Sequence, residues 1–216
     1  MKMNLPNKLT VLRLIMVPIF MVVMLIPVFA ALSPITDMIL TLVGAFLFIA
    51  ASLTDMLDGK IARKYNLITD FGKFLDPLAD KFMVIGALLC IFFKSSNSGN
   101  KIMSTLLFAA LAVVVFRELA VTSIRLVASS SGGVVIAANM LGKIKTVFQI
   151  IAICSAMLEP VLIKVIGILL GEGSTPAFIL EYPPLTCVSF VVMIYLTIHS
   201  GINYIVGAWK YLDPQK

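Results

Sequence analysis

The chain of 216 residues contains few charged side chains, since Asp, Glu, Lys and Arg together make up 13% of it. Soluble domains usually contain about 25%, so this shortage excludes an ordinary soluble enzyme. Hydrophobic residues reach 60% of the sequence, and a disordered chain would have far fewer. The length allows several membrane spans of about 20 residues each. The composition therefore predicts a membrane protein.

Histidine and cysteine are also scarce. The single histidine is His199, and the three cysteines, Cys90, Cys154 and Cys187, all lie inside apolar runs without the spacing of metal ligands. The net charge is +6, and the basic residues lie at the ends of the apolar runs. This distribution is typical of membrane topology. We therefore expect membrane lipids as partners and no nucleic acid.

Six apolar stretches predict an all-α, polytopic membrane protein with six transmembrane helices in one domain (residues 1–216): Leu14–Leu32, Met38–Thr54, Phe82–Phe93, Ile102–Phe116, Thr146–Leu170 and Leu185–Ala208. The third and fourth stretches are too short to cross about 30 Å of hydrocarbon at about 1.5 Å per residue. They become long enough only if their helices continue through Asp76 and Asp80, and through Arg117 and Arg125. The second stretch likewise needs the acidic residues that follow it. Charged residues inside spanning helices are costly unless they face a cavity or each other.

The distribution of basic residues predicts the orientation. With the N-terminus placed inside, 14 of the 17 Lys and Arg residues fall on the cytoplasmic side, and only Lys94, Lys101 and Lys164 fall outside. Both termini are therefore expected to be cytoplasmic, with residues 1–13 as an interfacial segment. A cleaved signal peptide is the alternative, but the apolar run is long for one. A short chain without a transit segment is typical of a bacterial plasma membrane.

Four aspartates lie near the inside ends of the second and third predicted helices: Asp55, Asp58, Asp76 and Asp80. Spacings of three and four residues place each pair on one helix face, and small residues there leave room for a ligand. Four carboxylates in a low dielectric need compensation, which two divalent cations, Mg²⁺ or Mn²⁺, would provide. Two such ions commonly assist in-line attack at phosphorus. A solvated loop with salt bridges to nearby Lys and Arg residues is the alternative.

Residues 55–80 read DMLDGKIARKYNLITDFGKFLDPLAD, which contains the pattern D-x2-D-G-x2-A-R-x8-G-x3-D-x3-D. This pattern resembles the signature of the CDP-alcohol phosphotransferases, integral membrane enzymes of phospholipid synthesis. The resemblance implies that a CDP-linked lipid is the donor, that an alcohol attacks its phosphorus and that CMP leaves. It also implies an active site that faces the cytoplasm, and a homodimer.

The resemblance further implies roles for the signature residues. Asp55, Asp58 and Asp76 would be metal ligands, and Asp80 would be the general base and would also touch a metal. The CDP-lipid would contact Asp58 and a set of neighbouring positions: Gly59, Ala62, Arg63 and Gly72. Among these, the arginine would counter the phosphate charge, and the last glycine would let the cytidine approach closely.

Basic residues outside the signature indicate the acceptor. Arg117 and Arg125 lie eight residues apart, within about 80° on one helix, and with Lys143 they predict a pocket for a phosphorylated acceptor. Three further segments resemble those of family members that form phosphatidylglycerophosphate: FRELAVTSIR (116–125), GKIKT (142–146) and NKLTVLR (7–13). The resemblance implies CDP-diacylglycerol as donor and sn-glycerol 3-phosphate as acceptor. Inositol phosphate and serine are the alternative acceptors.

The sequence allows two interpretations of some positions. Asn7 and Thr10 belong to an N-x2-T-x2-R pattern that ends at Arg13, and they either contact the nucleotide of the CDP-lipid or cap and anchor the first helix. We interpret Lys145 as a topology residue that points away from the pocket, and Glu118 as a partner for another helix.

A divalent-cation transporter is the alternative for the whole chain. A cation path needs polar residues at every depth, however, and the outer halves of the predicted spans are almost free of charge.

Overall fold

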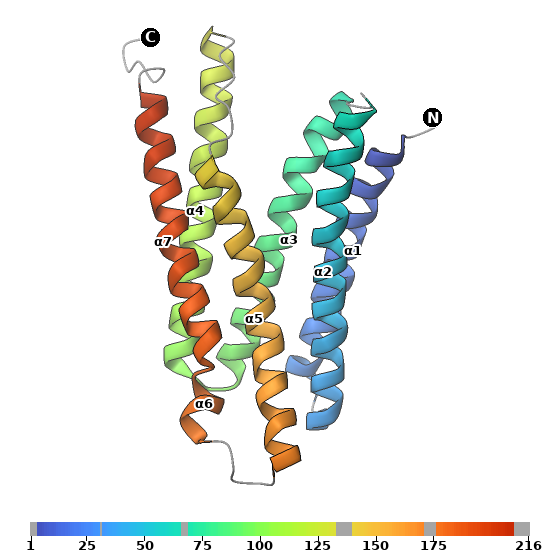
Figure 1. Cartoon of the computed structure of the whole chain (residues 1–216), viewed down its shortest axis with the longest axis vertical. Coiled ribbons are helices and arrows are strands. Elements are labelled where there is room, and N and C mark those ends of the chain that lie inside the picture. The colour runs from blue at the N-terminus through green and yellow to red at the C-terminus, as the bar shows by residue number, and fades with distance from the viewer. Residues whose placement is uncertain (1–3, 31, 66–68, 133–139, 171–175, 210–216) are drawn as a thin grey trace.

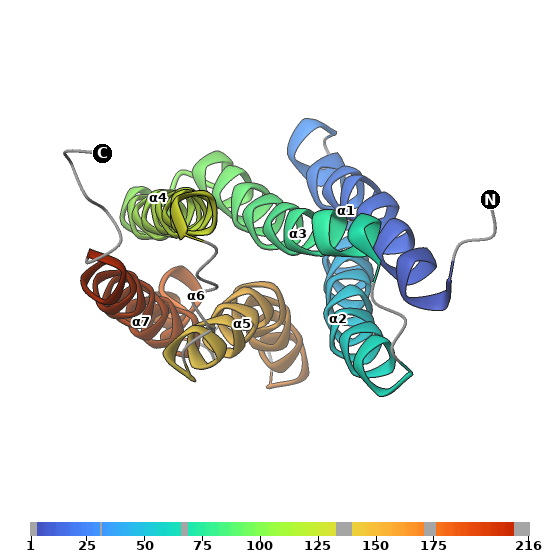
Figure 2. The same ribbon diagram turned by 90° about the horizontal axis from the view of Figure 1, so that it is seen from above.

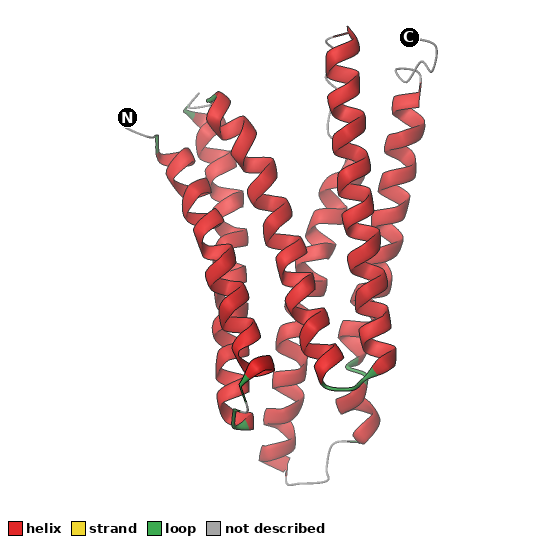
Figure 3. Cartoon of the chain, turned by 180° about the vertical axis from the view of Figure 1, so that it is seen from behind, coloured by secondary structure: helices red, strands yellow, loops and turns green. Residues whose placement is uncertain are grey.

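The computed structural model describes residues 4–30, 32–65, 69–132, 140–170 and 176–209. They form six long helices and one short helix: α1 (Leu5–Phe29), α2 (Pro34–Lys64), α3 (Asp70–Asn97), α4 (Lys101–Gly132), α5 (Met140–Leu170), α6 (Ala177–Glu181) and α7 (Pro184–Ala208). These residues contain no strand, as Figure 3 shows. The all-α prediction is confirmed, and each of the six predicted spans corresponds to one long helix.

The long helices extend beyond the apolar stretches that predicted them, and three of these extensions reach the charged residues of the site. The second helix extends to Lys64, the third begins at Asp70 and the fourth extends to Gly132. They therefore run through the neighbouring aspartates and arginines, as predicted. A helix satisfies its backbone hydrogen bonds internally, which a membrane requires. The charged side chains thus start from rigid helices and not from loops.

Five of the six long helices, namely α1, α2, α4, α5 and α7, are long and apolar enough to cross a membrane. The exception is α3, whose apolar stretch Phe82–Phe93 is short and lies between Lys81 and Lys94. The chain therefore has the hydrophobic helices of a multi-pass membrane protein. That α3 also spans, and that both termini are cytoplasmic, stay predictions.

The long helices form two groups, α1 to α3 on one side and α4, α5 and α7 on the other (Figures 1 and 2). Within the groups, α1 packs against α2 and α3, and α7 packs against α4 and α5. Contacts of α3 with α4 and of α2 with α5 connect the two groups. The beginning of α1 and the end of α7 lie at the same end of the bundle (Figure 1), where α2 also ends and α3 begins.

Small side chains allow the helices to pack closely. In a membrane the hydrophobic effect does not press helix against helix, and van der Waals contact between close backbones replaces it. Four alanines from four helices are buried in the core: Ala45, Ala87, Ala110 and Ala152. Phe20 and Phe48 fill the contact between α1 and α2, with ring centroids 6.0 Å apart. Large apolar side chains that face outwards, such as Phe46, Phe116 and Leu169, suit a lipid environment.

The segment predicted as interfacial is continuous with the first span. From Leu5 onwards it is the beginning of α1, and Asn7, Thr10 and Arg13 are buried. Steps of three residues keep these side chains within about 120° on one helix face. The described part of the segment thus belongs to the bundle, and its place at the membrane interface stays a prediction.

Candidate active site

The carboxylates of the signature come together at the end of the bundle where α2 ends and α3 begins. Asp55 lies on α2, and Asp76 and Asp80 lie one turn apart on α3. Nη1 of Arg13 on α1 is 2.5 Å from Oδ1 of Asp55 and 2.8 Å from Oδ1 of Asp80. One nitrogen reaches both oxygens, so carboxylates from two helices converge on a single positive centre.

Arg13 is more deeply buried than either of its partners. Its side chain is 0% exposed, whereas the side chains of Asp55 and Asp80 are 38% and 49% exposed. A buried guanidinium needs counter-charges, because removing it from water is costly. The carboxylates provide them and keep an open side toward solvent. Sequence reasoning missed this role, although the three-residue spacing from Asn7 to Arg13 marked the face that carries it.

Thr10 and Asn7 continue the same contact between α1 and α3. The Thr10 hydroxyl donates to Oδ1 of Asp76 over 2.6 Å, and Oδ1 of Asn7 accepts a hydrogen bond of 3.0 Å from the Thr69 hydroxyl. Both contacts anchor the beginning of the first helix, which is one of the two interpretations that the sequence left open. A contact with the nucleotide stays a prediction.

Gly72 lies where α1 approaches the beginning of α3. Its backbone N–H donates to the hydroxyl of Thr69, which caps the helix. A Cβ atom at this position would lie 2.9 Å from Oδ1 of Asn7 and 3.3 Å from Oγ1 of Thr69. The glycine therefore permits a close approach of two helices. A contact between Gly72 and the cytidine stays a prediction. In this structure Asn7 lies against the space that the absent side chain of Gly72 leaves.

We expect Gly72→Ala to lower the free energy of unfolding by about 1–2 kcal/mol, because the added methyl group would push Asn7 or Thr69 aside. Thermal unfolding of the purified protein in detergent measures this. Gly142→Ala is the matched control, because a Cβ there has no heavy atom within 4 Å. Equal unfolding temperatures for the two variants would show that the close approach at Gly72 contributes nothing.

For most of the remaining signature residues the structure describes the backbone but not the side chain. The backbones of Asp58, Ala62 and Arg63 belong to α2, but their side chains lie outside the described residues, and Gly59 is partly buried. Among the side chains that are described, no group of three acidic, histidine or cysteine residues surrounds one point. Carboxylate oxygens are the ligands that hard divalent cations prefer. In this structure Nη1 of Arg13 occupies the point between Asp55 and Asp80.

The residues of the predicted acceptor pocket lie on α4 and α5. Nη2 of Arg117 donates to the Ser200 hydroxyl over 2.9 Å, and Nε of Arg125 lies 3.4 Å from the Tyr204 hydroxyl. Both guanidinium groups thus contact α7, while Lys143 is exposed near the beginning of α5. These contacts do not join the three side chains, and their common pocket stays a prediction.

Lys145 corrects one sequence interpretation. Its side chain is 5% exposed and forms an ion pair with Glu118, which also accepts from Nη1 of Arg117 at 3.1 Å. It is therefore a buried partner of α4 beside Arg117, and the interpretation of Lys145 as a topology residue that points away from the pocket is wrong. Lys81, next to Asp80 on α3, donates to Thr122 of α4. A cluster of three cations and one carboxylate therefore connects α3, α4 and α5 beside the signature.

These features define a class: a multi-pass membrane protein that gathers acidic and basic groups at one end of its helices. A family model described as CDP-alcohol phosphatidyltransferase matches residues 3–174, and the chain belongs to this family of membrane enzymes. The matched range includes every site residue that the sequence predicted.

The names of similar proteins specify a particular reaction. The chain is 39% identical to the CDP-diacylglycerol–glycerol-3-phosphate 3-phosphatidyltransferase of Bacillus subtilis, with 97% of both chains covered. It is 35% identical to the protein of the same name from Wigglesworthia glossinidia brevipalpis, over 78% of this chain and 85% of the relative. A probable phosphatidylglycerophosphate synthase of Mycobacterium tuberculosis is 32% identical over 96% of this chain and 82% of its own length.

Proposed function

We propose that the protein transfers the phosphatidyl group of CDP-diacylglycerol to sn-glycerol 3-phosphate, which gives phosphatidylglycerophosphate and CMP. Relatives that carry this reaction in their names align with most of the chain. The structural observation that best supports the proposal is the convergence of Asp55 and Asp80 on Nη1 of Arg13. It brings carboxylates of the signature from two helices to one point.

In the proposed reaction, a hydroxyl oxygen of glycerol 3-phosphate attacks the phosphorus atom that carries diacylglycerol. A new P–O bond joins the acceptor, the P–O bond to CMP breaks, and CMP keeps its electron pair. Asp80 accepts the proton of the hydroxyl as general base. A carboxylate beside positive charge is a weak base, so its position next to the acceptor contributes as much as its basicity.

Asp55, Asp58 and Asp76 hold two divalent cations, Mg²⁺ or Mn²⁺, in this proposal, with Asp80 beside them. The family generally depends on divalent cations. When bound, such ions neutralise the diphosphate and stabilise the charge that develops at phosphorus. The protein contributes oxygen ligands on two rigid helices, and Gly59, Ala62, Arg63 and Gly72 line the space for the CDP group.

Removal of divalent cations should stop the transfer. We expect EDTA to abolish incorporation of labelled glycerol 3-phosphate into lipid, and Mg²⁺ or Mn²⁺ to restore it, because the carboxylates alone repel the diphosphate. A circular dichroism spectrum in EDTA controls for unfolding. Transfer that continues in EDTA, in protein shown by elemental analysis to be free of metal, would refute the metal site.

Arg117, Arg125 and Lys143 bind the acceptor phosphate in this proposal. Arg117 is the strongest candidate, because its side chain is 13% exposed and Glu118 and Ser200 hold its guanidinium at a fixed place. A phosphorylated acceptor uses such a charge, whereas serine has no phosphate to pair with it. Inositol phosphate remains the nearest alternative acceptor.

Arg117→Ala should raise the KM for glycerol 3-phosphate by about tenfold or more and change the KM for CDP-diacylglycerol little, since a charge-assisted contact to the acceptor is lost. Steady-state kinetics with each substrate varied in turn measures this. Arg117→Lys keeps the charge and should recover part of the loss. Equal increases in both KM values would assign Arg117 to the nucleotide side or to a structural role.

The orientation follows from the same proposal. Both termini and the active site face the cytoplasm of a cell with this protein in its plasma membrane, and two copies form a homodimer. The common end of the first and last long helices supports the placement of the termini. Membership of a transferase family supports the enzyme over the alternative of a divalent-cation transporter.

A further inference from the structure

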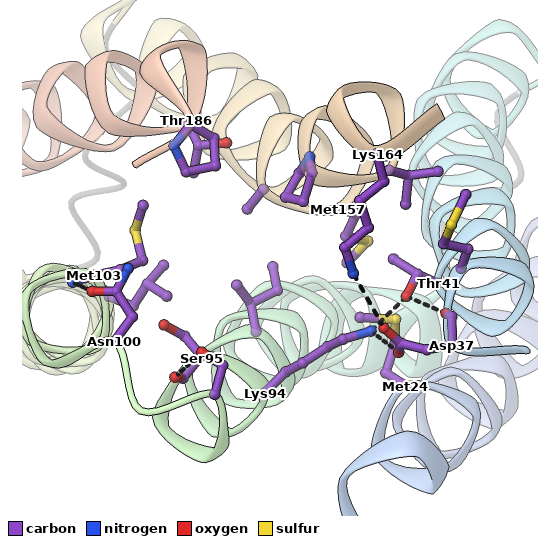
Figure 4. A pocket seen from close by; sticks show the side chains of 18 of the residues that line it. Met24, Asp37, Thr41, Lys94, Ser95, Asn100, Met103, Met157, Lys164 and Thr186 are labelled. Carbon is purple, nitrogen blue, oxygen red and sulfur yellow. Dashed lines mark hydrogen bonds and ion pairs between the residues drawn. The ribbon is translucent and has the colours of Figure 1, made fainter. Parts of the chain in front are cut away.

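A second polar cluster lies far from the signature, at the opposite end of the bundle. Asp37 and Asp55 are 18 residues apart on α2, which separates them by about 27 Å along the helix. Around Asp37 lie Thr41 of the same helix, Lys94 of α3 and Lys164 of α5 (Figure 4). These four residues border a cavity of about 380 Å³. The proposed reaction uses none of them.

The contacts in this cluster leave donor capacity on the two lysines. Nζ of Lys94 lies 2.5 Å from Oδ1 of Asp37 and 2.6 Å from Oγ1 of Thr41. Nζ of Lys164 lies 3.9 Å from Oδ2 of Asp37. An ammonium group has three N–H donors, and one carboxylate serves both lysines. Two positive charges therefore share one negative charge at this wall of the cavity.

Three other polar residues that border the cavity have partners of their own. Asn100 donates to the backbone carbonyl of Glu181 and lies across the cavity from Lys94 (Figure 4). The Glu181 carboxylate accepts from the Tyr182 hydroxyl, and Thr186 bonds to a glutamate of α5. Glu181 adds a second carboxylate to the lining, on α6. The wall formed by α2, α3 and α5 carries two lysines against one carboxylate, so this wall suits an anion.

Apolar side chains form the rest of the cavity. Met24, Met103, Met157 and Leu107 line it, and methionine adapts its shape to irregular apolar ligands. A positive wall above apolar walls matches an amphiphile better than a free inorganic ion, which would gain nothing from the apolar part. All five helices that are long and apolar enough to cross a membrane contribute residues to this cavity, together with α3, so a bilayer lipid is an amphiphile available to it.

We propose that this cavity binds an anionic phospholipid of the surrounding bilayer, with its phosphate on Lys94 and Lys164 and part of an acyl chain against the methionines. The binding lipid would belong to the leaflet opposite to the one that supplies the donor. It would bridge α2 and α3 to α5, and thus join the two groups of helices at the end remote from the signature.

Native mass spectrometry tests this with the whole protein in mild detergent, incubated with equal amounts of phosphatidylglycerol and phosphatidylcholine. We expect the wild type to retain mainly phosphatidylglycerol. Lys164→Gln should lower the ratio of retained phosphatidylglycerol to phosphatidylcholine by about tenfold, the effect of one lost charge-assisted contact. Lys164 is 46% exposed with a long ion pair, so the variant should fold. Unchanged thermal unfolding and transfer activity check this.

Lys101→Gln is the matched control, because Lys101 is an exposed lysine at the same end of the bundle that does not border the cavity. It should keep the wild-type ratio. Ala156→Phe places a ring in the cavity and should lower retention of both lipids. An excess of inorganic phosphate should not displace phosphatidylglycerol. A ratio in Lys164→Gln equal to that of the wild type, or full displacement by inorganic phosphate, would overturn the proposal.

Discussion

Asp76→Asn is expected to lower the turnover of the transferase by at least about a thousandfold, on the scale of the loss of a group that stabilises charge in the transition state. Asparagine has nearly the same shape, and its carbonyl oxygen still accepts the hydrogen bond that Thr10 donates at 2.6 Å. The contact between α1 and α3 should therefore survive. What is lost is the negative charge that, in the proposed site, ligates a divalent cation.

The measurement is kcat with CDP-diacylglycerol and labelled glycerol 3-phosphate, together with the unfolding temperature. Asp70→Asn is the matched control, because Asp70 is an exposed aspartate in the first turn of the same helix, at a position that the signature pattern leaves open. It should leave turnover within about twofold of the wild type. Wild-type turnover of Asp76→Asn would end the metal hypothesis.

Arg13→Met is expected to lower kcat by about a hundredfold and the free energy of unfolding by about 2–3 kcal/mol. The variant keeps most of the side-chain volume but leaves Asp55 and Asp80 facing each other without the guanidinium that both contact at 2.5 and 2.8 Å. The carboxylates repel each other and move apart, and small displacements of catalytic groups are costly in rate. The stability loss is below that of a fully buried pair, because solvent reaches both carboxylates.

Arg13 is a positioning residue, because it acts by holding Asp55 and Asp80 in place. Its test must therefore separate the effect on kcat from the effect on the free energy of unfolding. Arg13→Lys should recover part of the stability but little of kcat, because one flexible ammonium does not hold two carboxylates as a planar guanidinium does. Lys8→Met, an exposed lysine on the same helix, should change neither quantity. Full kcat in Arg13→Met, with only the unfolding temperature lowered, would reduce Arg13 to a structural role.

The helices could be predicted from the sequence because their apolar stretches are long. The shortness of two stretches also predicted correctly that helices run through Asp76, Asp80, Arg117 and Arg125. Residue spacing within one helix was enough for these conclusions, since the helix repeat fixes which side chains share a face. The short connection between the second and third helices also allows Asp55 to approach the aspartates of α3.

Contacts between helices were harder to predict, because a single sequence does not give the rotation of one helix against another. Arg13 joins three helices through Asp55 and Asp80, but on its own helix it is one more basic residue in the N-terminal half. Lys145 lies two residues from Lys143, and only packing against α4 decides which of them is buried with Glu118. Lys94 was assigned by topology alone and forms an ion pair with Asp37.

The central claim is tested most directly by an acceptor competition on purified protein in detergent. CDP-diacylglycerol and Mg²⁺ would be combined in parallel with labelled sn-glycerol 3-phosphate, inositol phosphate or serine, and the lipid products resolved. The proposal predicts label in lipid only from glycerol 3-phosphate, with CMP released in equal amount. Transfer from inositol phosphate or serine would overturn the acceptor, and no transfer from any of the three, in folded protein, would contradict the assignment as this transferase.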